Sequence, residues 1–294
     1  MATAKTKAPP ARLKIVSRMI GGHLAHWYEA PAGTSQAGRG VTTLLGNGLP
    51  APALIKWTGN TVATCALDEE DIWRPLLARD RNAAYEYLRS AADRDRDQAA
   101  NRGTEVHGYA ERMTLGEEVE PPDELLGHVD AYLAWVNEWT PEILEVELVG
   151  ANWTRRYFGR FDLLVKVKGF FADRAEVEAV VLVDIKTSRS GPFEKDALQL
   201  TAYRHFEEVG EPDDKGNIAE LRPMPKVDAC AVLQLSAEGY RFIPVNPDLD
   251  AQLFAQFLHV MRTAEFLGSG WSDKGKGWSR DALMPAIAAP YEPF

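Results

Sequence analysis

The sequence predicts an α/β fold in which a mixed sheet is flanked by helices, with a helical N-terminal elaboration. Apolar residues recur at helical spacing through most of 52–139, whereas strand-length apolar runs separated by turn residues begin at about 142. The order of elements after residue 123 is helix, three strands, helix, two strands and helix, which is typical of a mixed α/β core. The hydrophobic share of 45% and the charged share of 26% are those of a globular protein rather than a disordered one.

The N-terminal part is expected to divide into a tail and a helical region. Residues 1–12 are basic and are expected to form a disordered tail, and residues 13–102 a mainly helical elaboration. Residues 41–45 fit either a short strand or the start of a helix, because five residues are too few to distinguish the two periods. Pro52 suits the first turn of a helix. A further helix is expected near 103–113.

The second half of the chain is expected to alternate strands and helices. Strands are predicted at 143–149, 157–167, 177–186, 227–235 and 240–245. Helices are predicted at 123–139, 191–209 and 248–267. A loop at about 169–174 joins the second and third strands, so these two are expected to pair as a hairpin, and the strands at 227–235 and 240–245 are expected to form a second hairpin. Residues 268–294 are rich in Gly, Ser and Pro and are expected to form a C-terminal tail.

Charge and composition exclude several classes of protein. The net charge of −10 argues against a protein that coats nucleic acid without specificity. The charge is uneven, because 111–147 holds 11 acidic residues and one arginine whereas 151–206 holds 10 basic and 7 acidic residues. A local nucleic-acid site therefore remains compatible with the sequence. Two cysteines are too few for a disulfide scaffold, and no apolar run approaches the roughly 18 residues of a membrane span.

Three charged residues stand out because of where they fall in the predicted strands. Asp184 and Lys186 lie two apart near the end of an apolar strand, so their side chains share one face. Asp162 lies on the neighbouring strand of the predicted hairpin and can bring a second carboxylate to the same place. Charged groups at the end of a buried strand are costly unless they pair or bind an ion. An ordinary ion pair is the simpler alternative for Asp184 and Lys186.

Two carboxylates and a backbone carbonyl suit a hard cation such as Mg²⁺ or Mn²⁺. The expected ligands are Asp162, Asp184 and the carbonyl of Ile185, together with His107, for which a structural role on its helix is the alternative. Lys186 can hold or activate a water, or stabilise charge on a phosphate. These are the requirements of metal-assisted phosphodiester hydrolysis.

Supporting roles are expected for residues around this centre. Gln199 and Tyr203 lie four apart on the next helix, where they can orient Lys186 or touch the substrate. Glu147 fits the metal site and a solvent-facing position equally well. Three arginines near the predicted hairpin fit either phosphate contacts or a solvated edge: Arg155, Arg156 and Arg160.

Four short motifs resemble the PD-(D/E)XK nuclease superfamily and, within it, the RecB-type exonucleases. They occur in the family's order as G-x-x-x-H at 103–107, G-x-x-D at 159–162, D-x-K at 184–186 and Q-x-x-x-Y at 199–203. Residues 41–57 are in addition similar to compact members encoded by bacteriophages. Phe161 replaces the proline of the family name, and the four cysteines of the iron–sulfur members are absent.

The resemblance implies a restriction-endonuclease-like fold with its nuclease core at 103–267. It implies a metal-dependent DNA exonuclease that uses Mg²⁺ or Mn²⁺ in recombination, repair or genome processing, with Asp162, Asp184, Lys186, Gln199 and Tyr203 as site residues. DNA, and a recombination or replication protein, are the expected partners, in the cytoplasm (the host's, if the protein is viral). The alternatives are a structure-specific endonuclease and a non-catalytic DNA-binding or assembly protein with the same fold.

Overall fold

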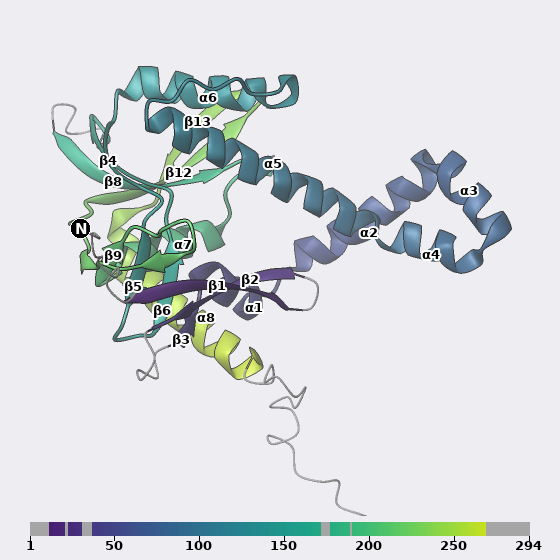
Figure 1. Cartoon of the computed structure of the whole chain (residues 1–294), viewed down its shortest axis with the longest axis horizontal. Helices are drawn as coiled ribbons and strands as arrows, with labels where there is room; N and C mark the ends of the chain where they lie inside the picture. The colour runs from purple at the N-terminus through teal and green to yellow at the C-terminus, as the bar shows by residue number, and fades with distance from the viewer. Residues whose placement is uncertain (1–11, 21–22, 31–36, 172–176, 189, 269–294) are drawn as a thin grey trace, which may run out of the picture.

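The structure is a computed structural model that describes residues 12–20, 23–30, 37–171, 177–188 and 190–268 (Figure 1). The two expected tails lie outside these residues, apart from Arg12 and Gly268 at their edges. The fold is mixed α/β, as the sequence predicts. Within the described residues, no helix combines the length and the apolar character needed to cross a membrane.

A five-stranded mixed sheet forms the centre, in the order β13-β12-β8-β7-β4. Its strands are β4 (Glu142–Val146), β7 (Leu163–Lys168), β8 (Glu178–Lys186), β12 (Ala229–Ser236) and β13 (Gly239–Pro244). The β8–β12 pair is parallel and the other pairs are antiparallel. The predicted pairing of β7 with β8 and of β12 with β13 is therefore confirmed.

Helices cover both faces of this sheet (Figure 1). One face carries α5 (Ala91–Thr114) and α6 (Asp123–Trp139), and the other carries α1 (Val41–Gly48), α7 (Glu194–Arg204) and α8 (Asp250–Gly268), which follows a short 3₁₀ turn. Alternate residues of β8 enter the two resulting cores, because successive side chains point to opposite faces. Val181 and Val183 pack beneath α5 and α6, whereas Leu182 packs beneath α7 and α8.

A second sheet corrects two strand predictions. The predicted strand 143–149 is broken at Glu147, which has a positive φ of 53°, and the predicted strand 157–167 is broken before Leu163. The strands of this second sheet have the order β11-β9-β5-β6. They are β5 (Val149–Asn152), β6 (Tyr157–Arg160), β9 (Glu208–Gly210) and β11 (Arg222–Pro223). The helix predicted to reach residue 209 ends at Arg204 because β9 pairs with β5.

A third sheet corrects the expectation that 13–102 is mainly helical from its start. It has the order β10-β1-β2-β3, with β1 (Leu13–Ile20), β2 (His23–Glu29), β3 (Ala37–Arg39) and β10 (Asn217–Ile218). Leu13 pairs with Ile218, and both side chains are fully buried in one cluster. Residues 41–45, which fitted either element, begin the helix α1.

Three helices form an arm that projects away from the sheets (Figure 1). They are α2 (Pro52–Asp68), α3 (Glu70–Arg79) and α4 (Arg81–Arg89), and the long helix α5 returns the chain to the central sheet. The predicted boundary between residues 102 and 103 falls inside α5, which runs without a break.

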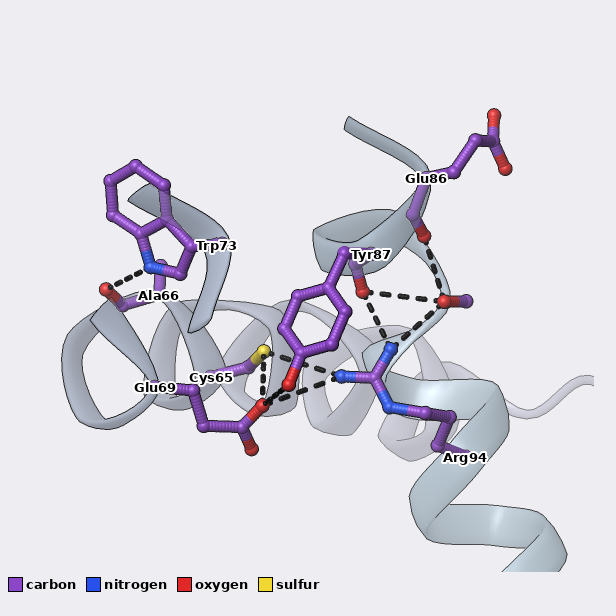
Figure 2. Close-up of polar contacts among 8 residues, drawn as sticks. Cys65, Ala66, Glu69, Trp73, Glu86, Tyr87 and Arg94 are labelled. Atoms are coloured by element: carbon purple, nitrogen blue, oxygen red, sulfur yellow. Dashed lines mark hydrogen bonds and ion pairs between the residues drawn. The ribbon is translucent and has the colours of Figure 1, made fainter. Parts of the chain in front are cut away.

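A polar cluster around Glu69 holds the arm to α5 (Figure 2). Oε2 of Glu69 accepts hydrogen bonds from the Tyr87 hydroxyl at 2.5 Å and the Cys65 thiol at 3.3 Å, and it pairs with Arg94 at 3.5 Å. Arg94 also donates to the Tyr87 carbonyl at 2.6 Å. Because these side chains come from α2, α4 and α5, the cluster joins three helices where the ends of α2 and α4 meet the first turn of α5.

Candidate active site

At one end of the central sheet, acidic residues lie on β8 and directly beside β7 and β4, which are three neighbouring strands. In the register of the sheet, Val146 of β4 is opposite Leu163 of β7, and Leu163 is opposite Val183 of β8. The residues that come next at this edge are therefore Glu147, Asp162 and Asp184. The two antiparallel pairings place the backbones of these three residues side by side.

Asp162 is held by the backbone of β8. Its Oδ2 accepts a hydrogen bond of 2.6 Å from the backbone N–H of Ile185, and its side chain is 14% exposed. An extended residue presents its N–H and its C=O to the same side of the strand. The Ile185 carbonyl, an expected metal ligand, therefore faces the side of β8 on which Asp162 lies.

Asp184 and Lys186 form an ion pair on the face of β8 that α7 covers. The Asp184 side chain is buried, and its Oδ1 accepts a hydrogen bond of 2.8 Å from Gln199. The same Gln199 amide also donates to the Tyr203 hydroxyl at 3.2 Å. The expected helix motif thus contacts Asp184 rather than Lys186, and the structure places Tyr203 one step further from the carboxylates.

His107 reaches the site from α5, on the opposite side of the sheet. Its Nδ1 lies 3.6 Å from Oδ2 of Asp162. One turn earlier on the helix, Gly103 passes close to Thr187, whose hydroxyl would lie 3.2 Å from a Cβ at that position. A glycine there lets α5 approach the end of β8, which brings the histidine within reach of Asp162.

Glu147, whose position the sequence left undecided, also lies at this site. One ligand atom from each of His107, Glu147 and Asp162 lies within 4.8 Å of the others. The Glu147 carboxylate pairs with Arg160 at 2.5 Å, and its backbone N–H donates to the Asp162 carbonyl at 2.7 Å. The signal for Glu147 in the sequence is weak, because its place depends on the chain break between β4 and β5.

The arginines predicted near the hairpin do not lie together. Arg155 and Arg156 are exposed in the turn between β5 and β6, at the far end of β6 from the carboxylates. Arg160 is at the near end and is paired with Glu147. Only Arg160 of these three residues contacts the site.

Burial and mutual repulsion shift the titration of the site. Burial and the nearby Asp162 charge raise the pKa of Glu147 to about 7. Burial raises the pKa of Asp184 to about 6, against the attraction of Lys186. Burial alone would lower the pKa of His107, but Asp162 and the other carboxylates outweigh it and raise that pKa to about 9. The pKa of Asp162 is lowered, since His107 and Lys186 outweigh its burial.

The donor set fits a divalent cation. Carboxylate oxygens suit Mg²⁺ and Mn²⁺, and an imidazole nitrogen is a ligand that Mn²⁺ also accepts. His107, Glu147 and Asp162 have converging ligand atoms, whereas both oxygens of Asp184 contact side chains of the protein. The candidate set of metal ligands therefore consists of His107, Asp162 and Glu147, and Asp184 lies beside it.

Comparison with known proteins gives no further assignment. No protein-family model matches the chain, and no curated protein is significantly similar to it.

Proposed function

We propose that the protein is a metal-dependent deoxyribonuclease of the PD-(D/E)XK superfamily, with a restriction-endonuclease-like core. The observation that carries the proposal is the meeting of Asp162 with the Asp184–Lys186 pair at one edge of the central sheet. The same four sequence motifs that resemble the RecB-type exonucleases supply this edge and its neighbours. Exonucleolytic hydrolysis of DNA, in recombination, repair or genome processing, is the activity that the resemblance favours.

Mg²⁺ or Mn²⁺ would be held by His107 and Asp162, together with Asp184 and the Ile185 carbonyl, and Glu147 is placed to join them. The bound cation would polarise the phosphate and activate a water for attack on phosphorus.

The protein's own residues would hold this centre in place. Lys186 carries an ammonium group beside Asp184, where it can hold a water or neutralise charge that develops on the phosphate. Gln199 keeps the Asp184 carboxylate oriented by donating a hydrogen bond to it, and the Tyr203 hydroxyl orients Gln199 by accepting a hydrogen bond from the same amide. We assign Gln199 and Tyr203 as positioning residues, because both are buried.

The test is cleavage of end-labelled linear DNA and of closed circular DNA with Mg²⁺ or Mn²⁺, using wild type and Lys186→Ala. We expect loss of the linear DNA alone, abolished by the substitution and by EDTA. Cutting of the circle would instead indicate an endonuclease. No metal-dependent cleavage of either DNA by folded protein would contradict the nuclease proposal and favour a DNA-binding or assembly protein.

A further inference from the structure

Arg160 forms an ion pair with Glu147, one of the two carboxylates whose oxygens converge with the His107 imidazole. Nε of Arg160 lies 2.5 Å from Oε2 of Glu147, and the side chains are 43% and 16% exposed. Arg160 is the last residue of β6, two positions before Asp162. The arginine therefore reaches the edge of the site from the solvent side and holds a carboxylate that faces inward.

The backbone of Glu147 is anchored independently of this ion pair. Its N–H donates to the Asp162 carbonyl, and the neighbouring Leu148 carbonyl accepts from Phe161 at 3.1 Å. These bonds keep Cα of Glu147 beside Asp162 whether or not the side chain is paired with Arg160. The carboxylate can therefore exchange partners by side-chain rotation alone.

Each of the three carboxylates has one basic neighbour: Glu147 has Arg160, Asp162 has His107, and Asp184 has Lys186. A divalent cation that binds beside Glu147 and Asp162 adds two positive charges to this set. Arg160 is the most exposed of the three basic side chains, so it is the one that can leave at the least cost in desolvation.

We propose that Arg160 is an exchangeable counter-ion that couples metal binding to substrate binding. In the metal-free protein it pairs with Glu147, and when the cation takes Glu147 as a ligand, Arg160 turns outward and contacts a phosphate of the DNA. This inference rests on the proposed function and assigns to it a sixth charged residue. A guanidinium freed from a carboxylate is well suited to phosphate, since both anions accept the same paired donors.

The first test measures Mn²⁺ affinity by titration calorimetry without DNA. We expect Glu147→Gln to weaken binding roughly tenfold or more, as loss of a metal-site carboxylate does. We expect Arg160→Gln to strengthen binding roughly two- to fivefold, because the metal no longer competes with a partly exposed ion pair. In the Glu147→Gln background, Arg160→Gln should have no effect, since the two residues act through each other. An equal gain in both backgrounds would overturn the proposal, because it would show a general effect of charge.

The second test measures DNA affinity against salt, in EDTA and in Ca²⁺, with the DNA verified to remain intact. In Ca²⁺, Arg160→Gln should reduce the slope of log affinity against log salt by about 1, as loss of one phosphate contact does. In EDTA the substitution should leave the slope unchanged, because Arg160 is then held by Glu147. The same change in both conditions, or in neither, would contradict the exchange.

Arg222→Gln is the matched control. Arg222 pairs at 2.5 Å with Glu145 of β4, which lies two residues before Glu147, and the side chains are 46% and 18% exposed. This pair nearly reproduces the Arg160–Glu147 pair outside the metal donors. We expect it to change neither the Mn²⁺ affinity nor the salt slope. Absence of Mn²⁺ binding by the wild type would remove the proposed function itself, whereas wild-type binding that Glu147→Gln does not weaken would overturn this inference alone.

Discussion

The backbone N–H of Ile185 donates a 2.6 Å hydrogen bond to Oδ2 of Asp162. This bond joins the residue before β7 to the end of β8, where the antiparallel ladder between the two strands has already finished. It therefore sets the position of one carboxylate by the backbone of the strand that carries Asp184 and Lys186. A site held on the strands of a sheet is positioned more closely than one held on loops.

Substitution of Asp162 separates its two tasks. We expect Asp162→Asn to weaken Mn²⁺ binding by at least about tenfold while an oxygen still accepts from Ile185. Asp162→Ala should in addition lower the free energy of unfolding by about 1–3 kcal/mol, because the buried Ile185 N–H then has no partner. Calorimetric metal titration and urea unfolding measure the two effects. Wild-type metal affinity in Asp162→Asn would remove Asp162 from the ligands.

His107 should titrate well above an ordinary histidine in the metal-free protein. Burial disfavours its charge, but the surrounding carboxylates raise its pKa to about 9. A raised pKa means that protonation stabilises the fold, so this contribution is fully present below about pH 6.5 and is lost as pH rises through 9. The excess stability of wild type over His107→Ala in EDTA should therefore shrink over this interval.

Imidazole chemical shifts measured by NMR against pH give the direct test of that pKa. Added Mg²⁺ should lower the apparent pKa of His107, because a metal ligand must be deprotonated. A histidine that titrates near 6.5 without metal, and does not respond to Mg²⁺, would contradict its place beside Asp162.

Gln199 should matter more for stability than its partner Tyr203. Gln199→Ala leaves the buried Oδ1 of Asp184 without its amide donor, which we expect to lower the free energy of unfolding by about 1–3 kcal/mol. Tyr203→Phe removes one hydrogen bond between neutral groups, with an expected cost of about 0.5–1.5 kcal/mol. Urea unfolding of both variants at neutral pH measures the two losses of stability. A larger loss for Tyr203→Phe than for Gln199→Ala would show that the amide does not hold Asp184.

Gly159 should tolerate no side chain. A Cβ at this position would lie 2.5 Å from the Tyr203 ring, so Gly159→Ala should cost about 1–3 kcal/mol through overpacking. Gly59→Ala is the control, because it lies inside α2 with no atom within 4 Å of the added Cβ. The helix should gain roughly 0.5–1 kcal/mol from that substitution. Thermal unfolding compares the two variants, and a neutral Gly159→Ala would contradict the packing of Tyr203 against β6.

The elements with a strong local period were predictable from sequence. The helix expected at 123–139 matches α6, and the strands expected at 177–186 and 227–235 match β8 and β12 within two residues. The pairing of β7 with β8 was predictable as well, because a short connection between two strands favours a hairpin. Asp184 and Lys186 lie in β8 and Asp162 directly precedes β7, which is why the sequence could predict that these three residues lie close together.

The parts that depend on distant pairings were not predictable. β1 pairs along its length with β2 as a local hairpin, which the prediction of a helical N-terminal region missed, whereas only Leu13 and Lys14 pair with β10, across most of the chain. Glu147 reaches the site only because the chain leaves the central sheet at that residue, with a positive φ, and enters the second sheet at Val149. Arg160 ends β6, a strand of the second sheet. Its ion pair with Glu147 therefore depends on how the two sheets meet, and it has no signature in the sequence.

The helix α5 has a mechanical consequence. Arg94, which clamps the arm, and His107, which faces Asp162, lie on this one unbroken helix, roughly 20 Å apart at 1.5 Å per residue. Because a helix is stiff along its axis, the position of the arm and the position of the imidazole are tied together through α5. A displacement of the arm that moved α5 would therefore also move a residue of the candidate metal site.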